Sequence, residues 1–252
     1  MTPDTLMQPR IITASLVLLG MLMATQATAS ISLNATRIVF DGSHKEANIT
    51  VRNGNQDVLI QSWVDMNDAS GSRAPFAVTP PLARVFAKEQ QLLRILYQGA
   101  GMPTDRESVV WLNVQEIPKA SEAENTLQLA IRQRIKIFYR PAGLPGNALQ
   151  APAQLEWRLA KQGTQTLLLV KNPTLYHVSM ADIKVQAQLA SDSTMIAPGE
   201  AKQFPLSATP ASGPVQLSFS SINDYGAQNH YTAPLSIGAA AAAYATESRL
   251  KP

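Results

Sequence analysis

The sequence predicts an all-β protein built from two β-sandwich domains, and three observations lead to this prediction. Short runs carry an apolar residue at every second position, which is the period of a half-buried strand. Segments rich in asparagine, glycine, proline and serine separate these runs at the short intervals typical of a β-sandwich. No apolar pattern with the period of a helix continues for several turns. The chain has 252 residues, of which 45% are hydrophobic, so it can form a substantial core.

The alternating runs fall into two groups along the chain. In the first half the alternating residues are Ala47, Ile49 and Val51, then Val58, Ile60 and Val64, then Val110, Leu112 and Val114. In the second half they are Leu155, Trp157 and Leu159, then Thr166, Leu168 and Val170, then Val215, Leu217 and Phe219. Between the groups, residues 141–146 hold two prolines and two glycines, which interrupt strands and helices alike. We therefore place one sandwich at residues 30–141, a linker at 142–146 and a second sandwich at 147–238.

The first 29 residues are predicted to be a cleavable signal peptide. Arg10 precedes the apolar stretch 11–24, and the small residues Ala27, Thr28 and Ala29 follow, which is the order of such peptides. The apolar stretch would span about 21 Å as a helix, less than the roughly 30 Å of a membrane's hydrocarbon layer, so a membrane anchor is the weaker interpretation. We expect cleavage after Ala29 and export. The absence of cysteine favours a bacterial periplasm over an animal extracellular space.

The composition argues against several classes of function. Lys and Arg number 21 and Asp and Glu 18, and the resulting net charge of +3 is too small for a nucleic-acid groove or a polybasic membrane anchor. The chain has no cysteine, and its histidines lack the spacing of metal ligands: they are His44, His177 and His230. A hydrolase is an alternative, but no nucleophile motif or carboxylate pair surrounds any histidine, so we expect surface or packing roles. We therefore expect no catalytic residue, no metal and no cofactor.

Residues 239–252 form an alanine-rich tail that begins with the run Ala239–Ala243. Because this run has no apolar face to bury, we expect it to be a frayed end or a marginal helix.

The segment from Thr126 to Tyr139 is unusual for a sandwich strand. It contains no glycine or proline, and most of its odd-numbered positions are apolar. At about 3.3 Å per residue it would be about 46 Å long, more than twice the typical length, so one core cannot cover the whole apolar row. Either the strand bends or changes sheets, or its first half lies at a sheet edge and offers Leu127, Leu129 and Ile131 to another chain. The pattern alone leaves both possibilities open.

The polar side of the same segment carries Arg132, Arg134 and Lys136. Cations at such positions usually face solvent and keep a sheet edge soluble. The pattern gives no reason to assign a function to one of the three.

Seven short motifs follow one another along both predicted domains. They are Asn34–Gly42, Thr79–Pro81, Asp105–Ser108, Asn113–Pro118, Ile135–Pro141, Asn172–Thr174 and Ile222–Gly226. Each motif alone is unspecific. Together and in this order, from Ser30 to about Ile237, they resemble the periplasmic pilus chaperones of the chaperone-usher systems.

The resemblance implies two immunoglobulin-like domains in an L-shaped arrangement, and a chaperone rather than an enzyme. It also implies strand donation, and it assigns three sets of residues. Two basic residues match those that hold the C-terminal carboxylate of a pilus subunit: Arg37 and Lys136. Three apolar residues match the donated strand: Leu127, Leu129 and Ile131. Three charged residues match an ionic cluster between the domains: Glu107, Arg140 and Asp224.

The partners implied by the resemblance are pilus subunits and the outer-membrane usher that receives them. An empty chaperone is expected to cap its exposed strand by forming a dimer. The stretch Pro118–Asn125 is short and a cysteine pair is absent, as in the short-loop class of these chaperones. The alternative is that the chain is itself a pilus subunit or adhesin. Such a subunit should carry an alternating N-terminal extension, whereas residues 30–40 resemble the chaperone's first strand.

Overall fold

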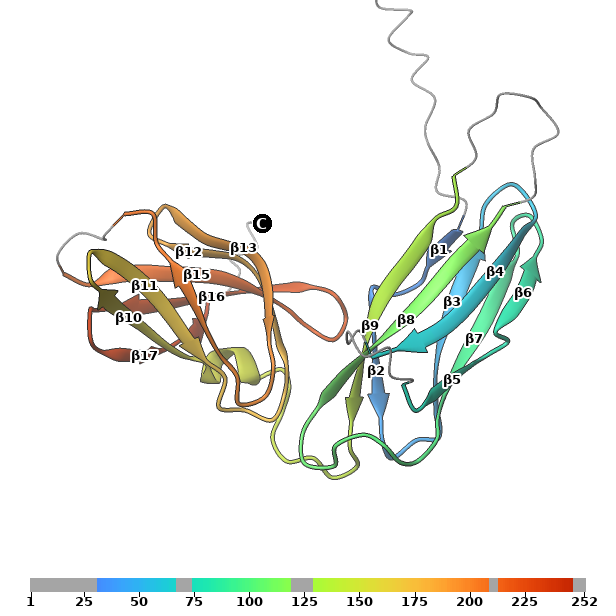
Figure 1. Cartoon of the computed structure of the whole chain (residues 1–252), viewed down its shortest axis with the longest axis horizontal. Helices are drawn as coiled ribbons and strands as arrows, with labels where there is room; N and C mark the ends of the chain where they lie inside the picture. The colour runs from blue at the N-terminus through green and yellow to red at the C-terminus, as the bar shows by residue number, and fades with distance from the viewer. Residues whose placement is uncertain (1–30, 67–73, 119–128, 209–212, 247–252) are drawn as a thin grey trace, which may run out of the picture.

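The computed structural model describes residues 31–66, 74–118, 129–208 and 213–246, and Figure 1 shows them as two β-sandwiches joined at an angle. The predicted signal peptide, Leu127 and residues 119–125 of the short stretch lie outside this part of the chain. The described residues include one short 3-10 helix, η1 (Ala151–Gln154), and none of their helices is long and apolar enough to cross a membrane. The predicted fold class, two β-sandwiches in an L-shaped arrangement, is confirmed.

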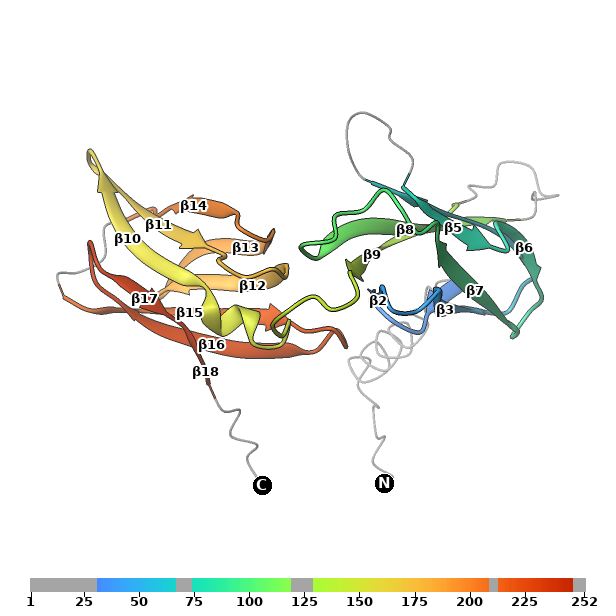
Figure 2. The same cartoon turned by 90° about the horizontal axis from the view of Figure 1, so that it is seen from below.

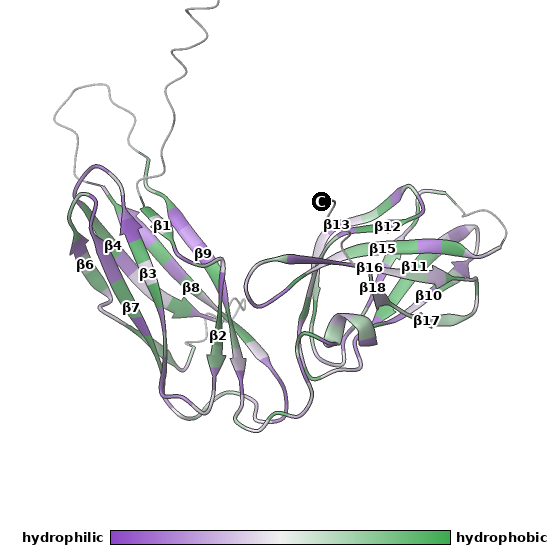
Figure 3. Ribbon diagram, turned by 180° about the vertical axis from the view of Figure 1, so that it is seen from behind, coloured by the Kyte–Doolittle hydropathy of each residue, from purple (hydrophilic) through white to green (hydrophobic). Residues whose placement is uncertain are grey.

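The first sandwich packs a four-stranded sheet against a five-stranded sheet. The four-stranded sheet has the order β1 (Ile31–Leu33), β3 (Glu46–Asn53), β7 (Gln90–Tyr97) and β5 (Phe76–Thr79). The five-stranded sheet has the order β2 (Arg37–Asp41), β9 (Arg132–Arg140), β8 (Ser108–Ile117), β4 (Val58–Asp65) and β6 (Leu82–Val85). The polar stretch of β9 is visible in Figure 3.

The N-terminal part of the chain changes from one sheet to the other. β1 pairs antiparallel with β3, and β2 then pairs in parallel with β9, which places Arg37 opposite Lys136. Gly42 follows β2 directly, and a Cβ atom there would lie 2.8 Å from the carbonyl oxygen of Arg140, so this close approach requires glycine. β2 covers β9 from Lys136 to Arg140. Within the described chain, the first half of β9 therefore has no strand partner on this side.

The second sandwich also consists of a four-stranded and a five-stranded sheet. The first has the order β14 (Ala201–Pro205), β11 (Gln165–Lys171), β10 (Glu156–Gln162) and β17 (Ala240–Ala242). The second has the order β13 (Gln188–Ile196), β12 (Val178–Val185), β15 (Val215–Ile222), β16 (Gln228–Leu235) and β18 (Tyr244–Ala245).

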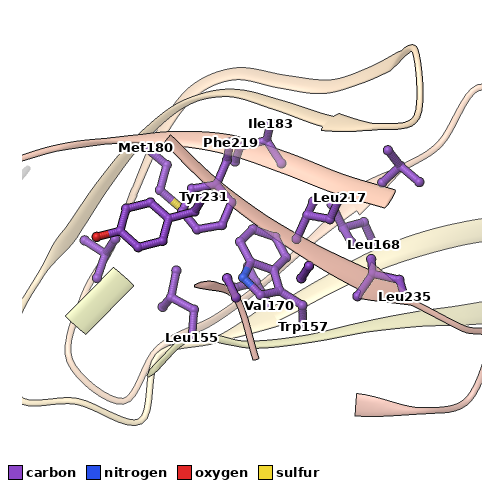
Figure 4. Close-up of a cluster of buried hydrophobic side chains, with 14 of the residues drawn as sticks. Leu155, Trp157, Leu168, Val170, Met180, Ile183, Leu217, Phe219, Tyr231 and Leu235 are labelled. Carbon is purple, nitrogen blue, oxygen red and sulfur yellow. The ribbon is translucent and has the colours of Figure 1, made fainter. Parts of the chain in front are cut away.

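Each sandwich has its own hydrophobic core, formed by the inward-facing positions of its strands. The predicted alternating residues supply much of both cores. Figure 4 shows the second core, in which Trp157 is fully buried and its ring centroid lies 5.1 Å from that of Phe219. Phe219 in turn stacks on Tyr231 at 5.3 Å. Because each core is closed within one sandwich, the surface between the domains is free to hold polar groups.

The expectation of a frayed or helical tail is wrong. Ala240–Ala242 forms β17 on the edge of β10, and Tyr244–Ala245 forms β18 on the edge of β16. The prediction considered only side chains, whereas the backbone N–H and C=O groups of an edge strand can pair with any extended segment. Ala243, between the two short strands, is buried against the second core.

The expectation of one strand from Thr126 to Tyr139 is also wrong in the part that the structure describes. β9 begins at Arg132, and Leu129–Ile131 belong to no strand. Alternation alone does not make a strand, because a strand needs a neighbour to pair with. The pairing of β8 with β9 stops at Gln115 opposite Arg132, and one further hydrogen bond joins the Glu116 N–H to the Ile131 carbonyl at 2.9 Å.

Candidate functional site

Arg140 joins the two domains through charged hydrogen bonds. It is the last residue of β9, and its two Nη atoms donate to the carboxylate of Asp224 at 2.8 and 2.7 Å. Its Nε donates to Oε2 of Glu107 at 2.6 Å. Glu107 precedes β8 in the first domain, whereas Asp224 lies in the turn between β15 and β16 of the second. The structure thus brings Glu107, Arg140 and Asp224 together across the domain boundary.

His177 is a fourth member of this cluster, and sequence reasoning assigned it only a surface or packing role. Oε1 of Glu107 accepts the backbone N–H of His177 at 2.8 Å and lies 3.0 Å from its Nδ1. The backbone N–H of Glu107 donates to the Leu175 carbonyl at 2.9 Å. Glu107 is only 2% exposed, so its charge depends on these partners rather than on water.

The cluster keeps Arg140 charged. Burial lowers the pKa of Arg140, but the hydrogen bond with Asp224 and the negative charge of Glu107 outweigh burial and raise this pKa above its usual value. A buried charge network of this kind is stable only while every member keeps its partner.

Arg37 and Lys136 lie side by side next to this cluster. Their Cα atoms are partners in the parallel pairing of β2 with β9. Nη1 of Arg37 donates to the Ile222 carbonyl of the second domain at 2.9 Å, and the guanidinium lies 5.6 Å from the ring centroid of Phe138. Nζ of Lys136 lies 5.5 Å from the ring centroid of Trp111. Each of the two neighbouring cations therefore lies near an aromatic ring, and Arg37 also reaches the second domain.

The electrostatics of this pair favour an anionic ligand. Burial lowers the pKa of Arg37, and the negative charge of Asp224 opposes this effect. Burial also lowers the pKa of Lys136, and the positive charge of Arg37 lowers it further. Among the described residues, no carboxylate forms an ion pair with Lys136. A bound carboxylate would relieve both the repulsion and the lost hydration.

The neighbouring cations of β9 differ from Lys136 in their surroundings. Arg134 is 2.6 Å from Oδ1 of Asp65, and its guanidinium stacks 4.5 Å from the ring centroid of Trp111. Arg132 is exposed. The strand pattern does not distinguish Lys136 from these two arginines, whereas the structure shows Lys136 as the neighbour of Arg37.

The apolar row of β9 continues beyond the core. Tyr139 and Ile137 are 6% and 0% exposed, whereas Ile131 and Leu129, which precede β9, are 40% and 71% exposed. Leu127 would continue the row but lies outside the described residues. Exposed apolar side chains therefore directly precede the half of β9 that lacks a strand partner on this side within the described chain.

Phe138 is a site residue that sequence reasoning missed. It is 4% exposed, and its ring lies beneath Arg37 and 6.2 Å from the ring of His177. Its signal was present in the sequence, because Phe138 is an apolar residue on the otherwise polar face of β9. An apolar residue at such a position indicates contact with a second structural unit.

Comparison with known proteins identifies the family. The model described as "Pili and flagellar-assembly chaperone, PapD N-terminal domain" matches residues 30–145, and "Pili assembly chaperone PapD, C-terminal domain" matches residues 150–233. The chain belongs to the pilus assembly chaperones. The "Probable fimbrial chaperone LpfB" of Escherichia coli O157:H7 is 38% identical to this chaperone over 229 residues, covering 88% of the chaperone and 95% of LpfB.

Two solved structures agree with this assignment. The periplasmic chaperone SfaE is 32% identical, with a TM-score of 0.64, and the match covers 82% of this chaperone and 100% of SfaE. A chain in the structure of the Salmonella enterica SafA pilin in complex with the SafB chaperone is 29% identical, with a TM-score of 0.69. That match covers 88% of this chaperone and 99% of the other chain.

Replacing Arg140 by alanine is expected to lower the free energy of unfolding by about 3 kcal/mol, because Glu107 stays buried after losing its guanidinium partner. Urea denaturation measures this change. Arg84→Ala, which breaks an exposed ion pair with Asp57, is the control and should leave the unfolding free energy unchanged within error. A loss for Arg140→Ala as small as that of the control would contradict a structural role for the cluster.

Replacing Lys136 by methionine is expected to stabilise the empty chaperone at pH 7. The lowered pKa means that folding disfavours the charged lysine, and this penalty is complete below the folded-state pKa. The penalty fades as the pH rises from that lowered value to the unfolded value of about 10.4, so the advantage of Lys136→Met should shrink across this window. Urea denaturation at a series of pH values tests this, with Arg132→Met as the control for removing a cation from the same strand. A constant difference across the window would contradict the assignment.

Proposed function

We propose that this chaperone holds pilus subunits in the periplasm by lending them the segment that leads into β9 as an extra strand. It then delivers the subunits to an outer-membrane usher. The exposed apolar row of Leu129 and Ile131, next to the unpaired half of β9, carries the proposal. An exposed apolar edge normally promotes aggregation, so we expect a binding partner to cover it. The complex of SafA pilin with SafB chaperone supports a subunit as that partner.

In the proposed complex, a subunit that lacks one strand of its own sheet pairs with the free edge of β9. Leu127, Leu129 and Ile131 then fill the groove left by the missing strand. Burying each large aliphatic side chain contributes about 1.5–3 kcal/mol before the cost of ordering. Strand exchange needs no covalent step and no nucleotide, because the extension of another subunit can replace the lent strand at the usher.

Arg37 and Lys136 are proposed to anchor the C-terminal carboxylate of the subunit. A carboxylate removed from water needs charged donors, and an arginine beside a lysine supplies several of them. Arg37 begins β2 and Lys136 lies in β9, so anchoring the terminus also sets the register of the subunit against the donated strand.

Export by the predicted signal peptide would bring the chaperone to its subunits. The similar protein SfaE is a periplasmic chaperone, which supports this location.

Substitution of either anchor residue is expected to abolish subunit capture while the chaperone stays folded. The tagged chaperone is co-expressed with the subunits of the pilus operon in the same bacterium, purified by affinity and analysed by mass spectrometry. Wild type and Arg132→Ala should recover a subunit in near-stoichiometric amount, whereas Arg37→Ala and Lys136→Ala should lose at least nine-tenths of it. Equal recovery by all four proteins would disprove the anchor, and recovery by none of them would disprove subunit binding.

The empty chaperone is proposed to cap its own strand by forming a dimer, because an uncovered edge tends to pair with a copy of itself. Sedimentation velocity should show concentration-dependent association that Leu129→Arg weakens at least tenfold. Leu189→Arg changes an exposed leucine of the second domain, 48% exposed, and is the matched control. A wild-type protein that stays monomeric at every concentration would contradict this proposal.

A further inference from the structure

One side of the second sandwich would expose two edge strands if the chain ended at Leu235. The sheet orders place β10 and β16 next to last, followed only by the short strands β17 and β18. β10 and β16 contact each other across the sandwich, so their edges lie on the same side. Both are longer than the five-residue β14, which ends in Pro205 at the opposite edge. The β10 edge has no proline to block further pairing.

Residues 236–246 pair with part of each of these edges. β17 pairs antiparallel with residues 156–158 of β10, and the Gly238 N–H donates to the Leu159 carbonyl at 3.0 Å. β18 pairs with Tyr231 and Thr232 of β16, and the Thr246 N–H donates to the His230 carbonyl at 2.8 Å. Figure 2 shows this segment beside β16 on its way to the C-terminus. One segment therefore crosses from the edge of one sheet to the edge of the other.

The alanine run suits this crossing. Ala241 is opposite the buried Trp157 and packs against the core, and Ala243 is 5% exposed between the sheets. Ala240 and Ala242 face solvent. Small side chains let the segment pass close to both sheets, whereas a larger residue at position 241 or 243 would have to displace the core.

We infer that residues 236–246 act as an internal guard that prevents the second domain from pairing with a second copy of this chain. The open β10 edge would be self-complementary, because two copies related by a two-fold axis can pair their β10 strands antiparallel. The guard goes beyond the proposed function, since it concerns the second domain alone. Its consequence is that the part of β10 paired with β17 is not available to another strand.

The test uses the Leu129→Arg background, so that association through β9 does not contribute. In the full chain, Ala241→Asp places a charge against the core and should release the guard, whereas Ala240→Asp makes the same change on the solvent side. Sedimentation velocity should show at least tenfold tighter self-association for Ala241→Asp than for Ala240→Asp. The shortened chain, which lacks residues 236–252, should associate in the same way. A chain that lacks only residues 247–252 should not.

Two further measurements complete the test. Hydrogen exchange of the wild type should show the amides of Gly238 and Thr246 protected to the same degree as those of β16. A synthetic peptide of residues 236–246 should return the shortened chain to a monomer, whereas the peptide with Ala241→Asp should not. The inference is overturned if the shortened chain is folded and monomeric, or if the tail amides exchange freely. It is also overturned if the shortened chain does not fold, because the segment would then be part of the folding unit.

Discussion

The ion pairs of Arg140 connect the two domains, and the geometry of the site depends on them. Arg140 is the last residue of β9, the strand that also carries Lys136. Its partner Asp224 lies in the second domain, two residues after Ile222, whose carbonyl accepts a hydrogen bond from Arg37. One guanidinium therefore links the strand-donating edge to the opposite domain. Because Glu107 is buried, the network cannot loosen at one member without exposing an unpaired charge. The cation pair of Arg37 and Lys136 thus has a defined position relative to the exposed residues Leu129 and Ile131 that precede β9.

In both sandwiches, short strands cover part of the sheet edges. In the first domain, β2 covers only part of β9, and apolar side chains stay exposed beyond it. In the second domain, a segment of small residues reaches the edges of both β10 and β16. Both arrangements follow from one physical fact, which is that unpaired backbone groups at an edge invite a partner strand.

The sequence predicted the cores better than the site. Alternation identified Trp157, Leu168 and other core residues, and it also showed an apolar row too long for one core. Phe138 could have been found from its position on the polar face of β9. The pairing of Arg134 with Asp65 could not, because the two residues are 69 positions apart in the sequence. The tail was mispredicted because its partners are backbone groups of other strands.

By itself the sequence determined the all-β class, the two sandwiches and the family resemblance. These follow from local alternation and from short motifs, which need no knowledge of what lies nearby in space. The tertiary structure decided that Arg134 pairs with Asp65, that His177 joins Glu107, and which strand edges are covered. These properties depend on strand register and on contacts between distant segments, such as Arg140 with Asp224, 84 residues apart. The partner of a side chain depends on how distant segments pack together. Its tendency to be buried, in contrast, follows from the alternation of apolar and polar residues along its own strand.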